Sequence, residues 1–152
     1  MSEKVIKLLN EGRGRELTAI MQYMSQHYEA EDAGYGKLAD RLKKIAIVEM
    51  GHAEALAERI LFLGGQPSSE PDASVKKGQE IPALLATDKQ LEQQAMDMYR
   101  EASRVCAEEK DQVTRDLFEH ILKEEEDHWD EFDVTRDHVE KMGAAYLATL
   151  TG

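Results

Sequence analysis

Two glutamate–histidine pairs are the residues of this chain whose types and spacing could do chemistry. Glu49 is followed three positions later by His52, and Glu125 is followed three positions later by His128. Side chains three positions apart project from the same face of a helix, so each pair can offer a carboxylate and an imidazole to one metal ion. The pairs therefore predict metal binding.

The two pairs are related by a constant offset of 76 positions (125 − 49 and 128 − 52), which is half of the 152 residues. The same offset carries Glu16 to Glu92 and Tyr23 to Tyr99. Three apolar positions also follow it: Leu42 and Phe118, Ile45 and Ile121, Leu56 and Phe132. We interpret the chain as two related helical hairpins, each supplying one separate Glu, one Tyr and one Glu-x-x-His.

A bundle built from these hairpins would bring four carboxylates and two imidazoles to its apolar seam: Glu16, Glu49, His52, Glu92, Glu125 and His128. Clustered carboxylates away from water repel one another and take up protons unless cations compensate them. Two divalent ions would neutralise all four. Mixed oxygen and nitrogen ligation suits iron or manganese and offers no soft ligand for copper(I). Glu49 and Glu125 would bridge the two ions, and the other four side chains would each bind one ion. We expect Tyr23 and Tyr99 to be core residues bonded to ligand carboxylates.

Long amphipathic helices are needed to position these side chains. Residues 3–33 carry a helical apolar pattern without proline, and the Gly34-Tyr35-Gly36 break returns the chain antiparallel. A second helix follows from about Lys37 to Leu63, with Glu49 and His52 on its apolar face, and Gly64-Gly65 ends it. These boundaries predict the first helical hairpin.

The second hairpin has weaker boundaries. Thr87 or Asp88 is a plausible N-cap for the third helix, and the turn to the fourth lies near residues 109–111, where there is no Gly or Pro. The fourth helix stops at Gly143. The apolar piece 144–150 predicts a short fifth helix, which is too short to be stable alone and so packs against the bundle or another subunit.

All three prolines (Pro67, Pro71 and Pro82) lie in the segment between the second and third helices. About 20 extended residues can span up to roughly 66 Å, which exceeds the roughly 40 Å length of a 27-residue helix. The segment can therefore cross the whole bundle and start the third helix parallel to the second. We expect residues 1–152 to form a single all-α domain, a four-helix bundle with a long crossover.

The composition indicates which partners and which cell compartment to expect. A net charge of −12 argues against nucleic acid and anionic membrane, and it is compatible with attracting cations. No apolar run approaches about 18 residues, so neither a signal peptide nor a membrane span is indicated, and we expect a cytoplasmic protein. The single cysteine, Cys106, excludes an internal disulfide and any cysteine-based zinc or rubredoxin-type site.

The chain resembles the bacterioferritins along nearly its whole length. The segments that carry the resemblance are Arg15-Glu16-Leu17-Thr18-Ala19-Ile20-Met21-Gln22-Tyr23, Glu49-Met50-Gly51-His52, Glu92, Glu125-Glu126-Asp127-His128, the stretch from Glu58 to Gly65 and Lys141-Met142-Gly143. The resemblance implies a ferritin-like bundle with a ferroxidase di-iron site inside each subunit. It also implies a homo-oligomeric shell of 24 subunits built of dimers, which oxidises iron(II) with oxygen or peroxide and stores the mineral.

The family resemblance further implies a haem at a two-fold subunit interface, with Met50 as its axial ligand. At 100° per residue, Met50 points roughly 130° away from the mean direction of Glu49 and His52, out of the bundle core. Its helical neighbours Ala46 and Ala53 are small and leave room for something flat. An ordinary interface methionine is the alternative. A haem would be compatible with a small electron-transfer protein as its redox partner.

Three positions depart from the family pattern. Lys44 and Val48 stand where some members carry a His and an Asp as an extra iron site, and Leu56 stands where some have a second tyrosine. Two other functions stay open beside iron storage. One is a di-iron oxidase or peroxidase of the same fold, as in rubrerythrin relatives, that stores no mineral. The other is a helical scaffold or binding module that holds zinc or nothing.

Overall fold

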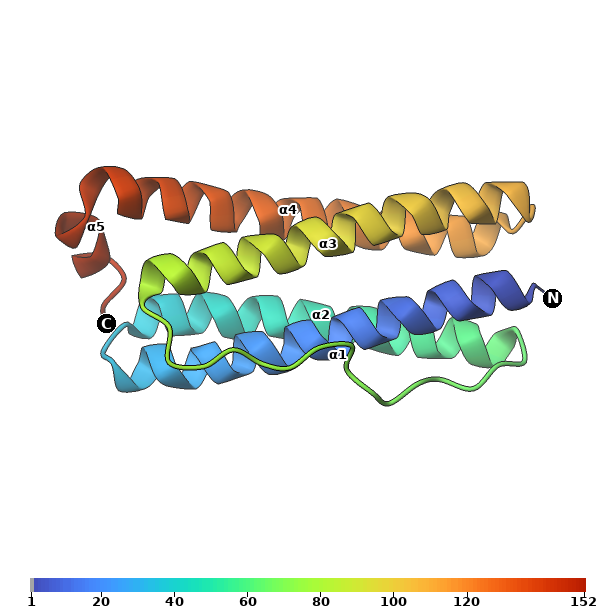
Figure 1. Ribbon diagram of the computed structural model, residues 1–152, viewed down its shortest axis with the longest axis horizontal. Helices are drawn as coiled ribbons and strands as arrows, with labels where there is room; N and C mark the ends of the chain where they lie inside the picture. Colours follow the sequence, from blue (N-terminus) through green and yellow to red (C-terminus); the bar gives the residue numbers. More distant parts are fainter. Residues whose placement is uncertain (1) are drawn as a thin grey trace.

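The computed structural model describes residues 2–152 and contains four long helices and one short one. The helices are α1 (Glu3–Asp32), α2 (Gly36–Phe62), α3 (Ile81–Glu108), α4 (Gln112–Met142) and α5 (Ala144–Ala148). Figure 1 shows the four long helices lying side by side, with α5 at the end of the bundle that holds the C-terminus. The prediction of a four-helix bundle with a short fifth helix is confirmed.

The turn between α1 and α2 has the chemistry expected from its glycines. Gly34 adopts a positive φ of 88°, and the backbone N–H of Tyr35 donates to the carbonyl of Ala30 at 2.8 Å, which closes the end of α1. Gly64, also at a φ of 88°, ends α2 in the same way. Both ends of α1 and of α2 therefore fall within about one residue of the sequence-based boundaries.

The connection of residues 63–80 runs back along the outside of α1, so that α2 and α3 are parallel (Figure 1). It is held there by hydrogen bonds from side chains of α1. Arg13 Nε donates to the carbonyl of Ser68 at 2.8 Å, and Gln22 Nε2 donates to the carbonyl of Lys76 at 2.9 Å. The predicted crossover is therefore confirmed as a segment bonded to the bundle along its length.

The start of α3 differs from the expectation. The helix begins at Ile81, not near Thr87 or Asp88, and Pro82 lies in its first turn. Proline is tolerated there because the first N–H groups of a helix have no partner inside the helix, and its fixed φ suits helix entry. Asp88 is therefore an interior helical residue, and its side chain is fully buried.

The turn between α3 and α4 forms without glycine or proline. Lys110 occupies the left-handed position with a φ of 58°, where glycine is usual. The Asp111 carboxylate then caps α4 by accepting from the backbone N–H of Thr114 at 3.0 Å. Arg59 of α2 donates to the Asp111 carboxylate at 3.1 Å and to the Thr114 hydroxyl at 2.8 Å, which fixes the turn from outside.

The apolar core forms two clusters that lie toward the two ends of the bundle. One contains Tyr23, Leu42 and Phe132, and the other contains Tyr99 and Phe118 beside further aliphatic side chains. The C-terminal piece packs on the first cluster, as expected: Leu150 is fully buried, and its carbonyl accepts from Lys37 N–H at 3.0 Å. The polar residues of the seam lie between two apolar layers.

One glycine permits a close helix approach near the seam. A Cβ atom added to Gly12 would lie 3.1 Å from the ring of Tyr99 and 3.3 Å from Leu56. These contacts are tighter than ordinary van der Waals separation, so Gly12 leaves room for the Tyr99 side chain.

Within residues 2–152, no helix combines the length and apolar character that a membrane crossing requires.

Candidate metal centre

The structure brings together all six side chains that the sequence singled out. Each of the four long helices contributes, and all six residues are buried, with exposed fractions between 0 and 7%. Helix α1 contributes Glu16, and α3 contributes Glu92. Helices α2 and α4 each contribute a Glu-x-x-His pair, Glu49 with His52 and Glu125 with His128. The seam of the bundle is therefore a closed cluster of acids and imidazoles.

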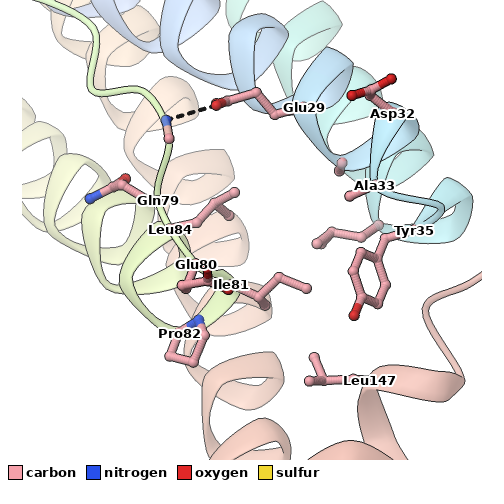
Figure 2. Close-up of a pocket in the computed structure, with 13 residues that line it drawn as sticks. Glu29, Asp32, Ala33, Tyr35, Gln79, Glu80, Ile81, Pro82, Leu84 and Leu147 are labelled. Carbon is pink, nitrogen blue, oxygen red and sulfur yellow. Dashed lines mark hydrogen bonds between the residues drawn. The ribbon is translucent and has the colours of Figure 1, made fainter.

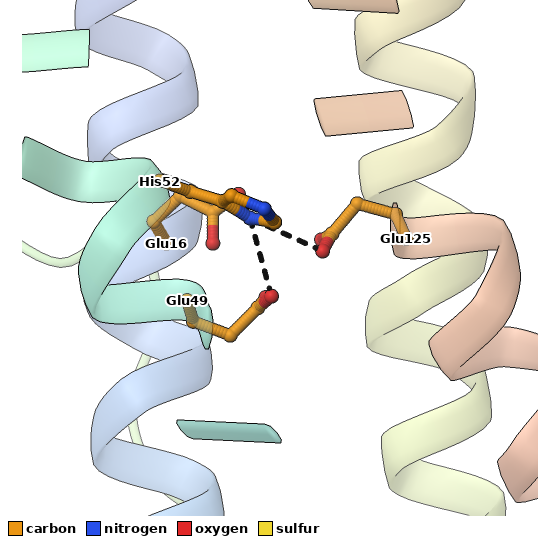
Figure 3. A group of neighbouring side chains, drawn as sticks. All are labelled: Glu16, Glu49, His52 and Glu125. Atoms are coloured by element: carbon orange, nitrogen blue, oxygen red, sulfur yellow. Dashed lines mark ion pairs between the residues drawn. The ribbon is translucent and has the colours of Figure 1, made fainter. Parts of the chain in front are cut away.

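The ligand atoms fall into two overlapping groups, and the atoms of each group lie within 4.8 Å of one another. Glu49 and Glu125 belong to both groups. The first group adds Glu16 and His52, and Figure 3 shows these four side chains converging from α1, α2 and α4. The second group adds one Glu and one His from α3 and α4. Two metal positions that share two carboxylates can thus be occupied together.

The two histidines present the same ring nitrogen to the carboxylates. His52 Nδ1 lies 3.4 Å from Glu16, 3.3 Å from Glu49 and 3.4 Å from Glu125. Figure 3 shows the His52 ring facing the Glu49 and Glu125 carboxylates. His128 Nδ1 lies 3.3 Å from both of the shared carboxylates. A nitrogen at the centre of several carboxylate oxygens is well placed as a metal ligand.

The cluster leaves many buried polar atoms without hydrogen-bond partners. They include both oxygens of Glu49, one oxygen each of Glu16, Glu92 and Glu125, and Nδ1 of both histidines. Buried polar groups in proteins are almost always satisfied, and unpaired ones need a physical explanation. Because these atoms all belong to the two four-residue groups, the donor set fits a pair of metal ions.

Burial and mutual repulsion alter the acidity of the carboxyl groups. Burial raises the pKa of Glu16, Glu49 and Glu92, and the charges of neighbouring glutamates raise it further. Burial alone would also raise the pKa of Glu125, but the imidazoles of His128 and His52, whose Nδ1 atoms lie 3.3 and 3.4 Å away, lower it below its usual range. The metal-free cluster therefore holds protons that metal ions would displace.

The same clustering raises the pKa of both histidines, which stabilises the charged form of each imidazole. Burial disfavours a charged imidazole, but the carboxylates of Glu125 and Glu49, each 3.3 Å from Nδ1, outweigh it and raise the pKa of His128 to about 12. The pKa of His52 is raised well above its usual value for the same reason. Both rings are protonated in the absence of metal, and a metal ion takes the place of a proton on each.

Two buried tyrosines orient the unshared glutamates. The hydroxyl of Tyr23 donates to Glu92 Oε1 at 2.7 Å, and that of Tyr99 donates to Glu16 Oε1 at 2.7 Å. Burial, together with the nearby carboxylates, raises the pKa of both tyrosines, so the hydroxyls keep their hydrogens. The expectation that these tyrosines bond to ligand carboxylates is confirmed.

Met50 lies on α2 outside the seam, with 43% of its side chain exposed. Met21 of α1 and Ile47 of α2 are also exposed, at 48% and 53%. Ala46 and Ala53, the small neighbours of Met50 along the helix, are buried. The surface of α1 and α2 thus exposes thioether and aliphatic side chains, whereas these two small neighbours of Met50 are covered.

Two acidic residues near the cluster were missed by the sequence analysis. Glu124 belongs to neither Glu-x-x-His pair, yet its carboxylate contacts His52 Nε2 at 3.0 Å. Asp88 was treated as a helix cap, yet it is fully buried, and burial raises its pKa well above its usual value. Helical spacing could have pointed to Asp88, which lies one turn before Glu92 on the same face.

A cavity of about 400 Å³ lies away from the metal centre. Figure 2 shows it at one end of the bundle, between the end of α1, the end of the crossover, the start of α3 and Leu147 of α5. Its walls combine aliphatic side chains with Glu29, Asp32 and Glu80. Within residues 2–152, the groups able to hold a metal ion are the two in the seam, so we assign the chemistry to the seam.

The fold and the six-residue cluster define a class of protein. The sequence model of the ferritin-like domain family matches residues 6–142 of this chain. More narrowly, the chain belongs to the bacterioferritin family. The bacterioferritin of Desulfovibrio desulfuricans is 43% identical over 149 residues, which covers 98% of this chain and 83% of that protein. That of Rhodobacter capsulatus is 36% identical over 147 residues, covering 97% and 91% of the two chains.

The similarity extends to a solved structure. An X-ray structure of the Desulfovibrio desulfuricans bacterioferritin, which describes its diiron site in different catalytic states, superposes with a TM-score of 0.96. The two chains are 43% identical, and the match covers 98% of this chain and 87% of the other. The resemblance inferred from the motifs is therefore confirmed.

Proposed function

We propose that this protein stores and detoxifies iron by oxidising iron(II) to iron(III) at a di-iron ferroxidase centre inside each subunit. The observation that carries the proposal is the pair of four-ligand groups that share Glu49 and Glu125 and leave their buried ligand atoms unpaired. Relatives with the same fold are bacterioferritins, and one of them is described with a diiron site. We assign the ligand set to Glu16, Glu49, His52, Glu92, Glu125 and His128.

The donor set supports iron over softer or larger metals. Carboxylate oxygens and imidazole nitrogens suit iron, and the only thiol in the chain, Cys106, lies in the apolar cluster with Phe118 and contributes to neither group. Two divalent ions would balance the charges of four ionised carboxylates. Two iron(II) ions supply two electrons, which is the number that reduces dioxygen to peroxide or hydrogen peroxide to water.

The protein's own residues would hold and release the ions. Glu49 and Glu125 would each contact both ions and fix their separation, while the buried seam keeps bulk water away from them. Tyr23 and Tyr99 would hold the terminal glutamates by their hydrogen bonds. Protons leave the imidazoles as metal binds, so binding strengthens as pH rises.

The same proposal includes an assembly and a haem. We propose a shell of 24 subunits built of dimers, with a haem at the two-fold interface bound by Met50 from each subunit. The exposed methionines and isoleucine on α1 and α2 support an apolar interface on this face. A bound haem would supply one-electron transfer, and a small electron-transfer protein would be its redox partner. We place the assembly in the cytoplasm, with neither nucleic acid nor membrane as a partner.

The ferroxidase assignment is tested by removing one terminal ligand. Glu92→Ala or His128→Ala should abolish rapid iron(II) oxidation, since each change removes a ligand and little packing. Stopped-flow oxidation at two irons per subunit measures the effect. Glu126→Ala is the matched control, because Glu126 is an exposed neighbour of Glu125 that belongs to neither group. An unchanged fast phase in both ligand variants would contradict the site assignment.

Storage is tested separately from oxidation. Gel filtration with an absorbance spectrum should show a large assembly with a haem band, and iron added in excess of two per subunit should remain bound as mineral. A small colourless dimer that oxidises iron and retains none would favour the oxidase or peroxidase alternative.

A further inference from the structure

The two histidines of the metal centre differ in what lies behind them. His52 uses Nδ1 toward the shared carboxylates, and its other ring nitrogen, Nε2, lies 3.0 Å from Glu124 Oε1. The same Glu124 oxygen lies 3.1 Å from Nε2 of His120, which is mostly exposed. Nε2 of His52 therefore has a hydrogen-bond partner outside the seam, Nδ1 faces the seam unpaired, and Glu124 is contacted from the outside by a second imidazole.

The contact fixes which ring nitrogen of His52 can bind a metal. A neutral imidazole has one N–H donor and one lone pair, and a carboxylate can only accept. With Nε2 donating to Glu124, Nδ1 is the nitrogen that gives up its proton to a metal ion, and it faces the seam. A carboxylate behind a ligand histidine also fixes the ring orientation and increases its basicity. The His52 ring is thus held with Nδ1 toward the seam, where a metal ion can take the place of its proton.

The His128 half lacks this support. Nε2 of His128 has no hydrogen-bond partner within residues 2–152, and His128 borders an open cavity of about 310 Å³. The 76-residue offset shows why: it carries Glu124 to Val48 (124 − 76 = 48) and His120 to Lys44 (120 − 76 = 44). Both residues at these positions line the cavity beside His128. The two hairpins therefore differ at the positions that support the histidine.

Charge increases the difference between the halves. Arg41 and Lys44 line the cavity beside His128, and Glu131 is the acidic residue there. On the other side, His52 has the Glu124 carboxylate behind it. Two cations and one anion near His128 repel a metal ion, whereas an anion behind His52 attracts it.

We propose that Glu124 is a positioning residue that makes the His52 half the tighter of the two metal positions. The tight position is the one formed by Glu16, Glu49, His52 and Glu125. The proposal rests on the metal centre assigned above and adds an order of filling: the first ion enters the His52 half, and the second enters the half with His128.

Cobalt(II) titration of the metal-free protein, followed by its visible absorption, tests this order. The parent should bind two ions per subunit in two resolved steps. Glu92→Ala, which damages only the His128 half, should keep the tight step, and Glu16→Ala should lose it. Equal affinities for the two ions in the parent would overturn the proposed order. If no cobalt(II) bound at the seam at all, the metal centre itself would be wrong, which separates the two failures.

The role of Glu124 is then tested on the tight step. Glu124→Ala should weaken it about 10- to 100-fold and leave the second step unchanged. The affinity of the tight step in Glu124→Gln should lie between those of the parent and of Glu124→Ala, because the amide oxygen still accepts from Nε2–H but carries no charge. Glu124→Gln also tests the role of Glu124 if the alanine variant fails to assemble. His120→Ala is the control, since it keeps the contact between Glu124 and His52. An unchanged tight step in both Glu124 variants would refute the positioning role.

A reciprocal variant tests the explanation from the other hairpin. Val48→Glu places a carboxylate at the position equivalent to Glu124, behind His128. It should tighten the second cobalt(II) step and bring the two affinities closer together, with the absorption spectrum of the first ion unchanged. A second step that stayed as weak as in the parent would show that a carboxylate at this position does not govern affinity.

Discussion

Tyr23 of α1 donates its hydroxyl hydrogen to Glu92 of α3 across 2.7 Å of the buried seam. The equivalent bond runs the other way between the hairpins, from Tyr99 of α3 to Glu16 of α1, also at 2.7 Å. Each hairpin therefore orients the terminal glutamate of the other. This exchange ties the two halves of the metal centre together and makes the tyrosines targets for testing it.

Tyr23→Phe should weaken the metal position on the His128 side about 10-fold, because Glu92 loses the bond that orients it while the ring keeps its packing. Cobalt(II) titration measures the affinity. Tyr28→Phe removes a hydroxyl from an exposed tyrosine of the same helix and should have no effect. If the tyrosine only filled space, both variants would bind metal as the parent does.

Metal-free protein should become less stable as pH rises from about 5 to about 8. The folded state raises the pKa of Glu16, Glu49 and Glu92 above the usual 4.5, and that of His128 from 6.5 to about 12. Groups whose pKa is raised on folding stabilise the fold fully at pH below their unfolded pKa, and this contribution is lost as pH rises. Glu125 has a lowered pKa and acts in the opposite sense, but only below about pH 4.5.

Thermal unfolding of metal-free and metal-loaded protein over this pH range measures the effect. The loaded protein should be the more stable at every pH, and the gap should widen toward high pH because metal ions replace protons. Glu49→Gln removes one of the titrating groups and should flatten the slope of the metal-free protein. A metal-free protein that gained stability between about pH 5 and about pH 8 would contradict the sign.

Glu49→Gln should weaken both metal ions together, since Glu49 belongs to both ligand groups. A neutral amide is a poorer bridge and leaves the site one negative charge short. Anaerobic titration with iron(II) measures the number of tight ions per subunit. Glu92→Gln is the matched comparison because Glu92 belongs to one group, so it should weaken one ion. Two tight ions in Glu49→Gln would rule out the bridging role.

Met50→Leu should remove haem while leaving iron oxidation at close to the parent rate. A two-fold interface presents the same residue twice, so one substitution removes both thioether ligands. Leucine keeps the volume and apolar character, so stability should change by less than about 1.5 kcal/mol. Haem content by absorbance should fall from one per two subunits to near zero. Met142→Leu, at a methionine of α4 with similar exposure, should keep its haem; full haem content in Met50→Leu would remove Met50 from the haem site.

The sequence by itself determined most of the helix boundaries and the six residues that we propose as metal ligands. The period of 3.6 residues fixes which side chains share a face, whatever the helix packs against, so Glu49 with His52 and Glu125 with His128 could be assigned locally. The repeat of 76 positions added Glu16 and Glu92. The glycines at residues 34 and 64 marked the helix ends because only glycine adopts a positive φ at little energetic expense.

Only the tertiary structure decided the features that depend on contacts between distant segments. The start of α3 at Ile81 was hidden because proline is both a helix breaker and a favoured first-turn residue. The turn at Lys110 carries no glycine, and its place is fixed by Arg59 from another helix. Glu124 resembles its exposed neighbours in sequence, and only the approach of α2 to α4 puts it against His52, since local periodicity fixes directions along one helix and not the distance between two.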